Sequence, residues 1–216
     1  MTTEKREEYL EQLYKLSQET DSVKSASLAH ELGLSSSTTS EMVKKLKEDG
    51  LIDKDKKELT LTRKGEKEAL NIIRKHRLAE RFFTDVLRLR WDDVHEEACR
   101  FEHVLSDKVA DALEKVLKNP DTCPHGNPIP RHSVLKEEKN IKLLSCLKAK
   151  QRGIVAKITD ESKEFLCYLA TLGLIPDAHV YIEQIAPFNG PMLIKVGKSK
   201  YAVGKEIADK IWVKQI

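Results

Sequence analysis

Residues 95 to 103, with the sequence HEEACRFEH, crowd two histidines, a cysteine and three glutamates into nine positions. At about 3.6 residues per turn, one face of a helix would carry four of these groups, His95, Cys99, Glu102 and His103. A thiolate, an imidazole and a carboxylate together suit a transition-metal ion, whereas calcium and magnesium prefer shells made only of oxygen. A solvated charged face is the ordinary alternative, and this helix alone does not decide between the two.

Length and composition indicate a soluble globular protein of one large or two modest domains, since 40% of the 216 residues are hydrophobic and 34% are charged. No run approaches the roughly 18 apolar residues of a membrane span, and the charged start, MTTEKREEYLEQLYKL, is unlike a signal peptide. We therefore expect a cytoplasmic protein whose cysteines, at 99, 123, 146 and 167, are free thiols or metal ligands. The net charge of +3 permits nucleic-acid binding without requiring it.

The first 63 residues have the pattern of a DNA-binding domain. A first amphipathic helix is predicted over 3–18, followed by a short helix, a tight turn at Gly33 and a second helix that serines 35 to 37 can cap. Short helix, glycine turn and helix is the helix-turn-helix arrangement. Residues 51–65, LIDKDKKELTLTRKG, alternate enough to predict a two-stranded hairpin with its tip at 55–57, which would complete a winged helix.

The second helix of this motif would place its N-terminal side chains in a DNA major groove. Hydroxyl groups there can contact phosphates or base edges, and lysines of the helix and of the wing add a basic rim. The candidate DNA-binding residues are Ser35, Ser37, Thr38, Ser40, Glu41, Lys44, Lys56 and Lys57. A helical hairpin in an unrelated fold is the alternative, which the wing that follows disfavours.

Residues 64–118 predict long, unbroken helices, because glycine is absent after Gly65 and proline before Pro120. Their apolar residues, among them Ile72, Phe82 and Val86, lie on more than one side and need a partner surface, which dimerisation can supply. The segment NPDTCPHGNPIP at 119–130, with four prolines, is expected to form an ordered or semi-rigid loop, followed by a connector over about 131–150.

From about residue 151 the residue pattern changes to short runs that are typical of β-strands. The runs RGIVAKIT, HVYIEQIAP, MLIKVG, KYAVG and KIWVKQI, interrupted by the helix SKEFLCYLATLGL, predict a small barrel. The expected fold class is therefore mainly α with a small β domain, and the expected domains are 1–63, 64–140 and 141–216.

Three motifs, RKHRLAERF at 74–82, HEEACRFEHVLSD at 95–107 and PHGNPIP at 124–130, resemble the DtxR/MntR family of metal-dependent transcriptional repressors. The resemblance covers nearly the whole chain, in the form with a winged helix-turn-helix, a helical dimerisation domain and a C-terminal SH3-like, FeoA-type domain. It implies a repressor that binds double-stranded operator DNA as a homodimer when Fe(II) or Mn(II) occupies two sites per protomer. It implies no enzymatic activity.

The resemblance also implies an activating metal site made of Cys99, Glu102 and His103 and closed by a residue of the first helix. Glu8 stands where iron-responsive members carry methionine and manganese-responsive members carry aspartate. A hard carboxylate beside a soft thiolate leaves the choice between iron and manganese open. Glu11 is a candidate to assist, as a matching glutamate does in the manganese type.

An ancillary site is implied at His76, Glu80 and His95, to which the C-terminal domain can add an oxygen ligand from Asp160 or Glu161. In addition, the loop residues Cys123 and His125 resemble a Cys-x-His pair that a subgroup of the family uses as ligands beside the Glu80 position. The alternative is that Cys123 only packs beneath a proline-rich loop.

Two other classes of function compete with a metal-dependent repressor. A metalloenzyme is disfavoured, because the chain contains no HExxH motif, nucleophile elbow or phosphate-binding loop. A constitutive winged-helix regulator with a structural metal site remains an alternative, and DNA affinity that survives a chelator would favour it.

Overall fold

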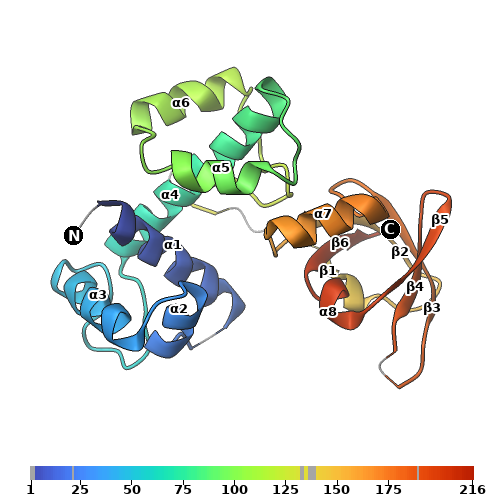
Figure 1. The fold of residues 1–216 in the computed structure, drawn as a ribbon, viewed down its shortest axis with the longest axis horizontal. Coiled ribbons are helices and arrows are strands. Elements are labelled where there is room, and N and C mark those ends of the chain that lie inside the picture. Colours follow the sequence, from blue (N-terminus) through green and yellow to red (C-terminus); the bar gives the residue numbers. More distant parts are fainter. Residues whose placement is uncertain (1–2, 21, 132–133, 136–139, 189) are drawn as a thin grey trace. The chain divides into compact units, whose positions relative to one another are not determined.

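The computed structural model of the chain describes residues 3–20, 22–131, 134–135, 140–188 and 190–216, with only the backbone of Glu19 (Figure 1). Its contacts divide the chain into two compact units. The first unit contains Met1–His76, Phe101–Ala110 and Pro130–Leu135, and the second contains Arg77–Arg100, Asp111–Ile129 and Lys136–Ile216. The three predicted domains remain a prediction, since the two units are divided differently.

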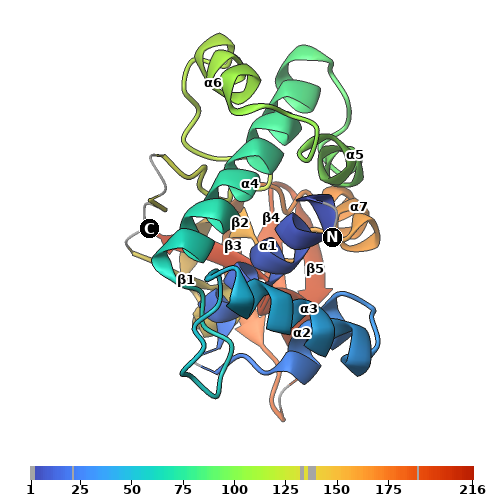
Figure 2. The same ribbon diagram turned by 90° about the vertical axis from the view of Figure 1, so that its left-hand side faces the viewer.

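The first unit begins with α1 (Thr3–Glu19), α2 (Ser25–Glu31) and α3 (Ser36–Glu48), as the sequence predicts. Figure 2 shows α2 and α3 side by side, joined through Gly33, whose φ of 63° suits a residue without Cβ. The Ser35 side chain accepts a hydrogen bond from the Thr38 amide at 3.2 Å, so the predicted serine cap is present. The apolar faces of the three helices meet in one core, which includes Tyr9, Leu10, Leu13, Leu28 and Leu46.

The predicted two-stranded wing is wrong in its extent. Among the described residues between α3 and α4, strand pairing is limited to one antiparallel bridge between Ile52 and Leu61, supported by the amide of Asp53 donating to the Thr60 carbonyl at 2.8 Å. The Leu59 amide instead donates to Val23 at 2.8 Å. The segment between these anchors lacks alternating apolar residues, so no buried face holds it in register.

The prediction of unbroken helices over 64–118 is also wrong. The structure has α4 (Arg63–Arg81) followed by a π-helical turn (Phe82–Val86), then α5 (Val94–Phe101) and α6 (Asp107–Val116). Arg88 ends the first helical stretch with a φ of 62°. A second break precedes α6, where the Ser106 hydroxyl accepts from the Val109 amide at 3.4 Å as an N-terminal cap. Glu102 and His103 therefore lie in a turn after α5 and not on the expected helical face.

The second unit contains an antiparallel sheet in the order β1-β6-β2-β3-β4-β5. The predicted strands and helix are present as β2 (Arg152–Ile158), α7 (Lys163–Leu172), β3 (His179–Ile185), β4 (Met192–Val196), β5 (Ser199–Val203) and β6 (Ile211–Gln215). Three short elements were not predicted, β1 (Ile141–Leu143), a 3-10 turn (Leu144–Cys146) and α8 (Lys205–Ala208). Part of the predicted connector, 132–133 and 136–139, lies outside the described residues.

One face of this sheet forms the core of the C-terminal domain. Val155, Val180, Ile182, Ile194 and Val213 are buried there and pack with α7 residues. The side chains that alternate with these buried residues along each strand point to the other face of the sheet. In the described part of the chain, no helix combines the length and apolar character needed to cross a bilayer.

Candidate metal sites

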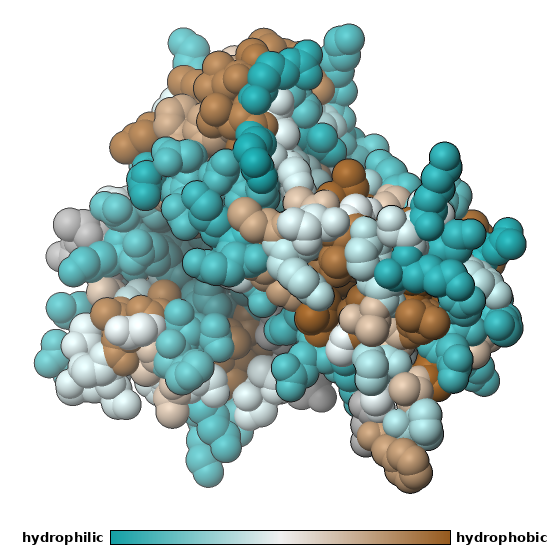
Figure 3. All heavy atoms as spheres, turned by 45° about the vertical axis from the view of Figure 1, so that its right-hand side comes forward, coloured by the Kyte–Doolittle hydropathy of each residue, from teal (hydrophilic) through white to brown (hydrophobic). Residues whose placement is uncertain are grey.

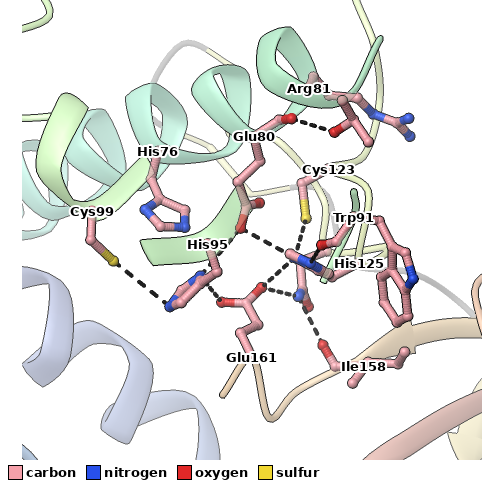
Figure 4. A network of polar contacts seen from close by, with 12 residues as sticks. His76, Glu80, Arg81, Trp91, His95, Cys99, Cys123, His125, Ile158 and Glu161 are labelled. Atoms are coloured by element: carbon pink, nitrogen blue, oxygen red, sulfur yellow. Dashed lines mark hydrogen bonds and ion pairs between the residues drawn. The ribbon is translucent and has the colours of Figure 1, made fainter. Parts of the chain in front are cut away.

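Four potential ligands converge in the second unit, and we call them the Cys123 cluster: Glu80, Cys123, His125 and Glu161. One ligand atom from each lies within 4.8 Å of the others. Figure 4 shows these side chains pointing toward one another from α4, the 121–129 loop and the segment before α7. Glu80 and His125 are fully buried and Cys123 is only 1% exposed, so the groups are held away from water.

The orientation of His125 is fixed by a backbone carbonyl. Its Nε2 lies 2.8 Å from the carbonyl oxygen of Trp91, which can only accept, so Nε2 carries a proton. The other ring nitrogen, Nδ1, then lies 3.1 Å from Glu80 Oε1, 3.6 Å from Glu161 Oε1 and 4.0 Å from the Cys123 sulfur. Metal-binding histidines are commonly held in this way, with the second N–H donated to a carbonyl.

Glu80 and Glu161 are shared with a second histidine of the same unit. His95 Nδ1 lies 3.2 Å from Glu80 Oε1 and 3.4 Å from Glu161 Oε2. Its Nε2 lies 3.7 Å from the sulfur of Cys99, one turn further along α5. The structure thus brings His95, Glu80 and Glu161 together, as the predicted ancillary site requires of these three residues.

The loop that carries Cys123 and His125 is ordered by backbone contacts. The Cys123 amide donates to the Asn127 carbonyl at 2.8 Å, and Thr122 and Pro128 form a bridge. Gly126 has a φ of 86°, and a Cβ there would lie 2.0 Å from the Ala156 carbonyl oxygen. Only glycine lets the loop approach β2 so closely, which confirms the prediction of an ordered loop.

Side chains on both sides of the loop hold it in place. Arg81 Nε donates to the Thr122 carbonyl at 2.6 Å, and Arg77 donates to the carbonyl of Pro128. Asn127 donates from Nδ2 to the Ile158 carbonyl at 2.9 Å and to Glu161 Oε1 at 2.7 Å. The Asn127 amide group therefore links the ordered loop to the carboxylate that the C-terminal domain contributes.

The electrostatics of the Cys123 cluster suit a cation. Burial lowers the pKa of His125, but the Glu80 carboxylate and hydrogen bonds to the neighbouring groups outweigh burial and raise that pKa. Burial and the Glu80 charge both raise the pKa of the Cys123 thiol. Two carboxylates, an imidazole and a thiol in one buried site are a mixed oxygen, nitrogen and sulfur donor set, which fits a divalent transition metal.

A second buried group, the Glu102 cluster, lies in the first unit and consists of Glu11, His76 and Glu102. His76 Nδ1 is 2.5 Å from Glu102 Oε2. Burial would raise the pKa of Glu11, but Lys15, whose Nζ is 2.9 Å from Glu11 Oε1, and His76 together lower it to about 2. These contacts connect α1 to α4 and to the turn after α5.

A third group in the first unit consists of Glu4, Glu8 and His103. His103 Nδ1 lies 2.8 Å from Glu7 Oε2, and its Nε2 lies 3.4 Å from Glu102 Oε1. Partial burial lowers the pKa of His103, but the hydrogen bond to Glu7 and the Glu102 charge raise it overall. The first unit therefore has two adjoining clusters that join α1 to the segment after α5.

The predicted ligands agree with the expectation in part. His76 contacts Glu102 in the first unit, but it also belongs, as expected for the ancillary site, to a group of potential ligands with Glu80, His95 and Glu161. Asp160 accepts from the amide and hydroxyl of Ser162, and among the described residues it joins no group of potential ligands, whereas Glu161 does. Sequence reasoning missed Glu4 and Glu7, although the acidic residues that recur at helical spacing with Glu8 and Glu11 were a signal.

The candidate DNA-binding residues are all exposed. Several hydroxyls at the start of α3 also bond within the helix end, since Ser40 donates to the Ser36 carbonyl at 2.7 Å and Ser35 lies 2.9 Å from Ser37. The lysines are exposed on α3 and on the bridged loop. The N-terminal end of α3 thus presents polar side chains and two basic flanks to solvent.

Three family models match successive parts of the chain. Residues 1–58 match "Iron dependent repressor, N-terminal DNA binding domain", and residues 62–131 match "Iron dependent repressor, metal binding and dimerisation domain". Residues 142–215 match the FeoA domain.

Relatives and solved structures extend the similarity. The chain is 34% identical to the iron-dependent repressor IdeR of Mycobacterium tuberculosis, over 97% of this chain and 96% of that protein. It is 43% identical to the diphtheria toxin repressor of Corynebacterium diphtheriae, over 57% of this chain and 55% of that protein.

A manganese-dependent transcriptional repressor solved with manganese has a TM-score of 0.89 and 32% identity, and the match covers 98% of this chain and all of that one. ScaR with bound Cd²⁺ gives 0.86 and 32%, covering 98% and 99% of the two chains. Because this similarity runs along nearly the whole chain, the protein belongs to the DtxR/MntR family of iron- or manganese-dependent transcriptional repressors.

Proposed function

We propose that this protein binds operator DNA as a homodimer when Fe(II) or Mn(II) occupies sites that link its DNA-binding helices to its dimerisation region. The observation that carries the proposal is the connection of α1 to the segment after α5. His103 lies 2.8 Å from Glu7 of α1, and Glu11 of α1 belongs to the buried cluster of His76 and Glu102. Since α1 packs in the same core as α2 and α3, holding α1 also holds the helix-turn-helix.

The Cys123 cluster and the Glu102 cluster are the two proposed metal sites of each protomer. Glu80, Cys123, His125 and Glu161 would hold one ion, with His95 beside them. Glu11 and Glu102 of the Glu102 cluster, with the adjoining Glu8 and His103, would hold the other, and the resemblance adds Cys99 to these ligands. A bound divalent cation supplies the positive charge that offsets these buried carboxylates.

The ligand residues act by joining segments that are distant in sequence. Glu102 and Glu11 are both buried acids, and in this structure Lys15 and His76 supply the positive groups beside them. A bound divalent cation would add to this positive charge and hold α1 against the turn after α5. Fixing α1 would set the positions of the two recognition helices of a dimer, which must match major grooves one turn of DNA apart or a multiple of it.

The energetics require more than one site. A ligand at about 100 times its dissociation constant stabilises the state it prefers by roughly 2.7 kcal/mol, whereas a switch from 1:99 to 99:1 needs about 5.5 kcal/mol. Two sites in each of two protomers supply this difference. We therefore expect activation of DNA binding to be cooperative in metal concentration.

The proposed dimer surface is an exposed apolar area of the second unit. Its large exposed side chains are Val86, Leu87, Leu89 and Val116, each more than 40% exposed. Hydrophobic atoms gather at the top of Figure 3, where Figure 1 labels α6. Exposed apolar side chains in this number suit an interface between copies of the chain.

The test is binding of the full-length protein to operator fragments under anaerobic conditions, titrated with Fe(II), Mn(II), Co(II) or Zn(II). We expect strong binding with metal, and loss of that binding in EDTA. Glu8→Ala and Cys99→Ala should each weaken the metal-dependent binding, while Glu48→Ala, on the exposed side of α3 away from both clusters, serves as a control.

A constitutive regulator with a structural metal site is the alternative. DNA affinity that is the same in EDTA and in saturating metal would support this alternative and exclude the proposed switch. Unchanged metal dependence in both Glu8→Ala and Cys99→Ala would exclude the proposed link through α1.

A further inference from the structure

The outward face of the C-terminal sheet carries a row of cations that the metal sites do not use. In the strand register, Arg152 of β2 lies opposite Tyr181 of β3, which lies opposite Lys195 of β4. Lys195 in turn lies opposite Lys200 of β5. With exposed Lys214 of β6 and partly buried Lys157, which is also on β2, these residues define the C-terminal basic face.

The residues of this face point away from the core. Buried neighbours along the strands, Val180 beside Tyr181, Ile194 beside Lys195 and Val213 beside Lys214, pack in the core that includes α7 residues. Because side chains alternate between the faces of a sheet, the cations lie together on the opposite face. Arg152, Lys195, Lys200 and Lys214 are all exposed.

This arrangement is unfavourable for the folded domain by itself. Like charges directly opposite each other on neighbouring strands are destabilising, and Lys195 faces Lys200 in this way. Glu183 contacts Lys200 at 2.7 Å and its charge also acts on Lys195, so it offsets part of this repulsion. Arg152, Lys157 and Lys214 still give the face an excess of cations. A polyanion that binds this face would remove the repulsion.

The aromatic residues of the face hold cations in position. The Arg152 guanidinium lies 5.7 Å from the centre of the Tyr181 ring, and Lys157 Nζ lies 5.0 Å from the Trp212 ring. Single-stranded nucleic acids are bound by stacking bases on open aromatic rings. On this face the protein's own cations already lie against the Tyr181 and Trp212 rings. We therefore expect the face to contact the phosphate backbone of duplex DNA, and not to stack on unpaired bases.

We propose that the C-terminal basic face is a second, sequence-independent DNA contact that binds the phosphates of duplex DNA beside the operator. The placement of this contact beside an operator rests on the proposed function, which brings the chain to DNA. The five adjacent strands of this face, from β6 to β5, span roughly 19 Å at about 4.8 Å spacing, and duplex DNA carries one charge per about 1.7 Å of its axis. The face is therefore wide enough to contact several phosphates of one duplex.

The experiment compares two double variants of the full-length protein for binding to random-sequence duplex DNA in EDTA, over a range of salt concentrations. Lys195→Gln with Lys214→Gln removes two charges from the face. Lys205→Gln with Lys210→Gln removes two exposed charges from α8 and the turn before β6.

We expect the first pair to make the fall of log affinity with log salt less steep by about 1.8, because two phosphate contacts at about 0.9 each are lost. Binding at moderate salt should weaken on the order of tenfold. The control pair should leave both quantities nearly unchanged. Equal losses in the two pairs, or no loss in the first, would overturn the proposal.

Two further measurements distinguish the DNA contact from a membrane contact and from the proposed metal switch. If the first pair lost binding to phosphatidylserine vesicles but kept its affinity for duplex DNA, the face would be a membrane contact and the proposal would be wrong. The proposed function fails on a different result, an operator affinity of the wild-type protein that does not depend on metal. Because the salt comparison is made without metal, that result would leave the comparison of the two pairs intact.

Discussion

The Nε2 atom of His125 donates to the carbonyl of Trp91 at 2.8 Å, and this contact leaves Nδ1 as the nitrogen that faces Glu80 and Cys123. A residue of the loop before α5 therefore decides which nitrogen of a histidine in the 121–129 loop can bind a metal. The contact explains how a loop without regular secondary structure can present a ligand in one orientation.

Cys123→Ser should weaken metal binding on the order of tenfold or more, because it removes a thiolate from a buried donor set. Cobalt(II) makes the effect visible, since a thiolate bound to cobalt gives a charge-transfer absorption in the near ultraviolet. The variant should lose much of this absorption, whereas Cys146→Ser, at an exposed cysteine outside the clusters, should retain it. Full absorption in Cys123→Ser would show that Cys123 only packs beneath its loop.

Gly126→Ala should destabilise the protein by about 3 kcal/mol or more, because the new methyl group meets the Ala156 carbonyl at a φ that favours glycine. Gly197→Ala is the matched control, with a φ of 57° and no atom within 4 Å of the added carbon. That control should cost only about 1 kcal/mol. Urea unfolding of both variants measures the difference, and equal costs would contradict the close approach of the loop to β2.

Leu87→Glu should convert dimers to monomers, because it places a charge in the proposed apolar interface. Leu87 is 50% exposed in the single chain. Ile175→Glu, at a residue of the C-terminal domain that is 40% exposed, should leave the oligomeric state unchanged. Sedimentation velocity distinguishes the two, and a dimer that persists in Leu87→Glu would place the interface elsewhere.

Asp92→Asn should lower the free energy of unfolding by roughly 1–2 kcal/mol at neutral pH, since the hydrogen bond from the exposed Arg90 is partly screened by solvent. Asp92 is buried and accepts from Arg90 and from the Cys167 thiol at 3.2 Å. The bond from Arg90 outweighs burial and lowers the pKa of Asp92 from 3.8 to about 2.

A depressed folded-state pKa gives stability that is present above pH 3.8 and is lost as the pH falls through about 2. The difference between wild type and Asp92→Asn should therefore be constant above about pH 5 and should shrink in acid. Asp55→Asn, at an exposed carboxylate of the bridged loop, controls for the loss of one charge. A difference that stays constant down to pH 2.5 would mean that ionised Asp92 does not stabilise the fold.

Local signals in the sequence were sufficient for the helix-turn-helix and for most C-terminal strands. The Ser35 cap and the turn at Gly33 depend on residues within one helical turn of each other, so the chain itself encodes them. Likewise, alternation of apolar and polar residues directly indicates strands such as β2 and β3.

The breaks in the helix around α5 depend on contacts with residues distant in sequence, which the local residue pattern does not reveal. The loop between the π-helical turn and α5 holds Asp92, whose thiol partner Cys167 lies 75 residues away. Helical propensity alone favours continuation through such a segment, and tertiary contacts override it. The wing was overestimated for the same reason, because an anchor at Val23 competes with strand pairing.

The sequence by itself determined which residue types can bind metal and that most of them are concentrated in α1, α4, the 95–103 segment and the proline-rich loop. Only the tertiary structure decided how they are grouped. His103 meets Glu7 across 96 positions of sequence, His76 meets Glu102 across 26, and Glu161 rather than Asp160 approaches His125. Ligand chemistry is a property of each side chain, whereas a binding site requires several side chains within a few ångströms, which only packing of distant segments provides.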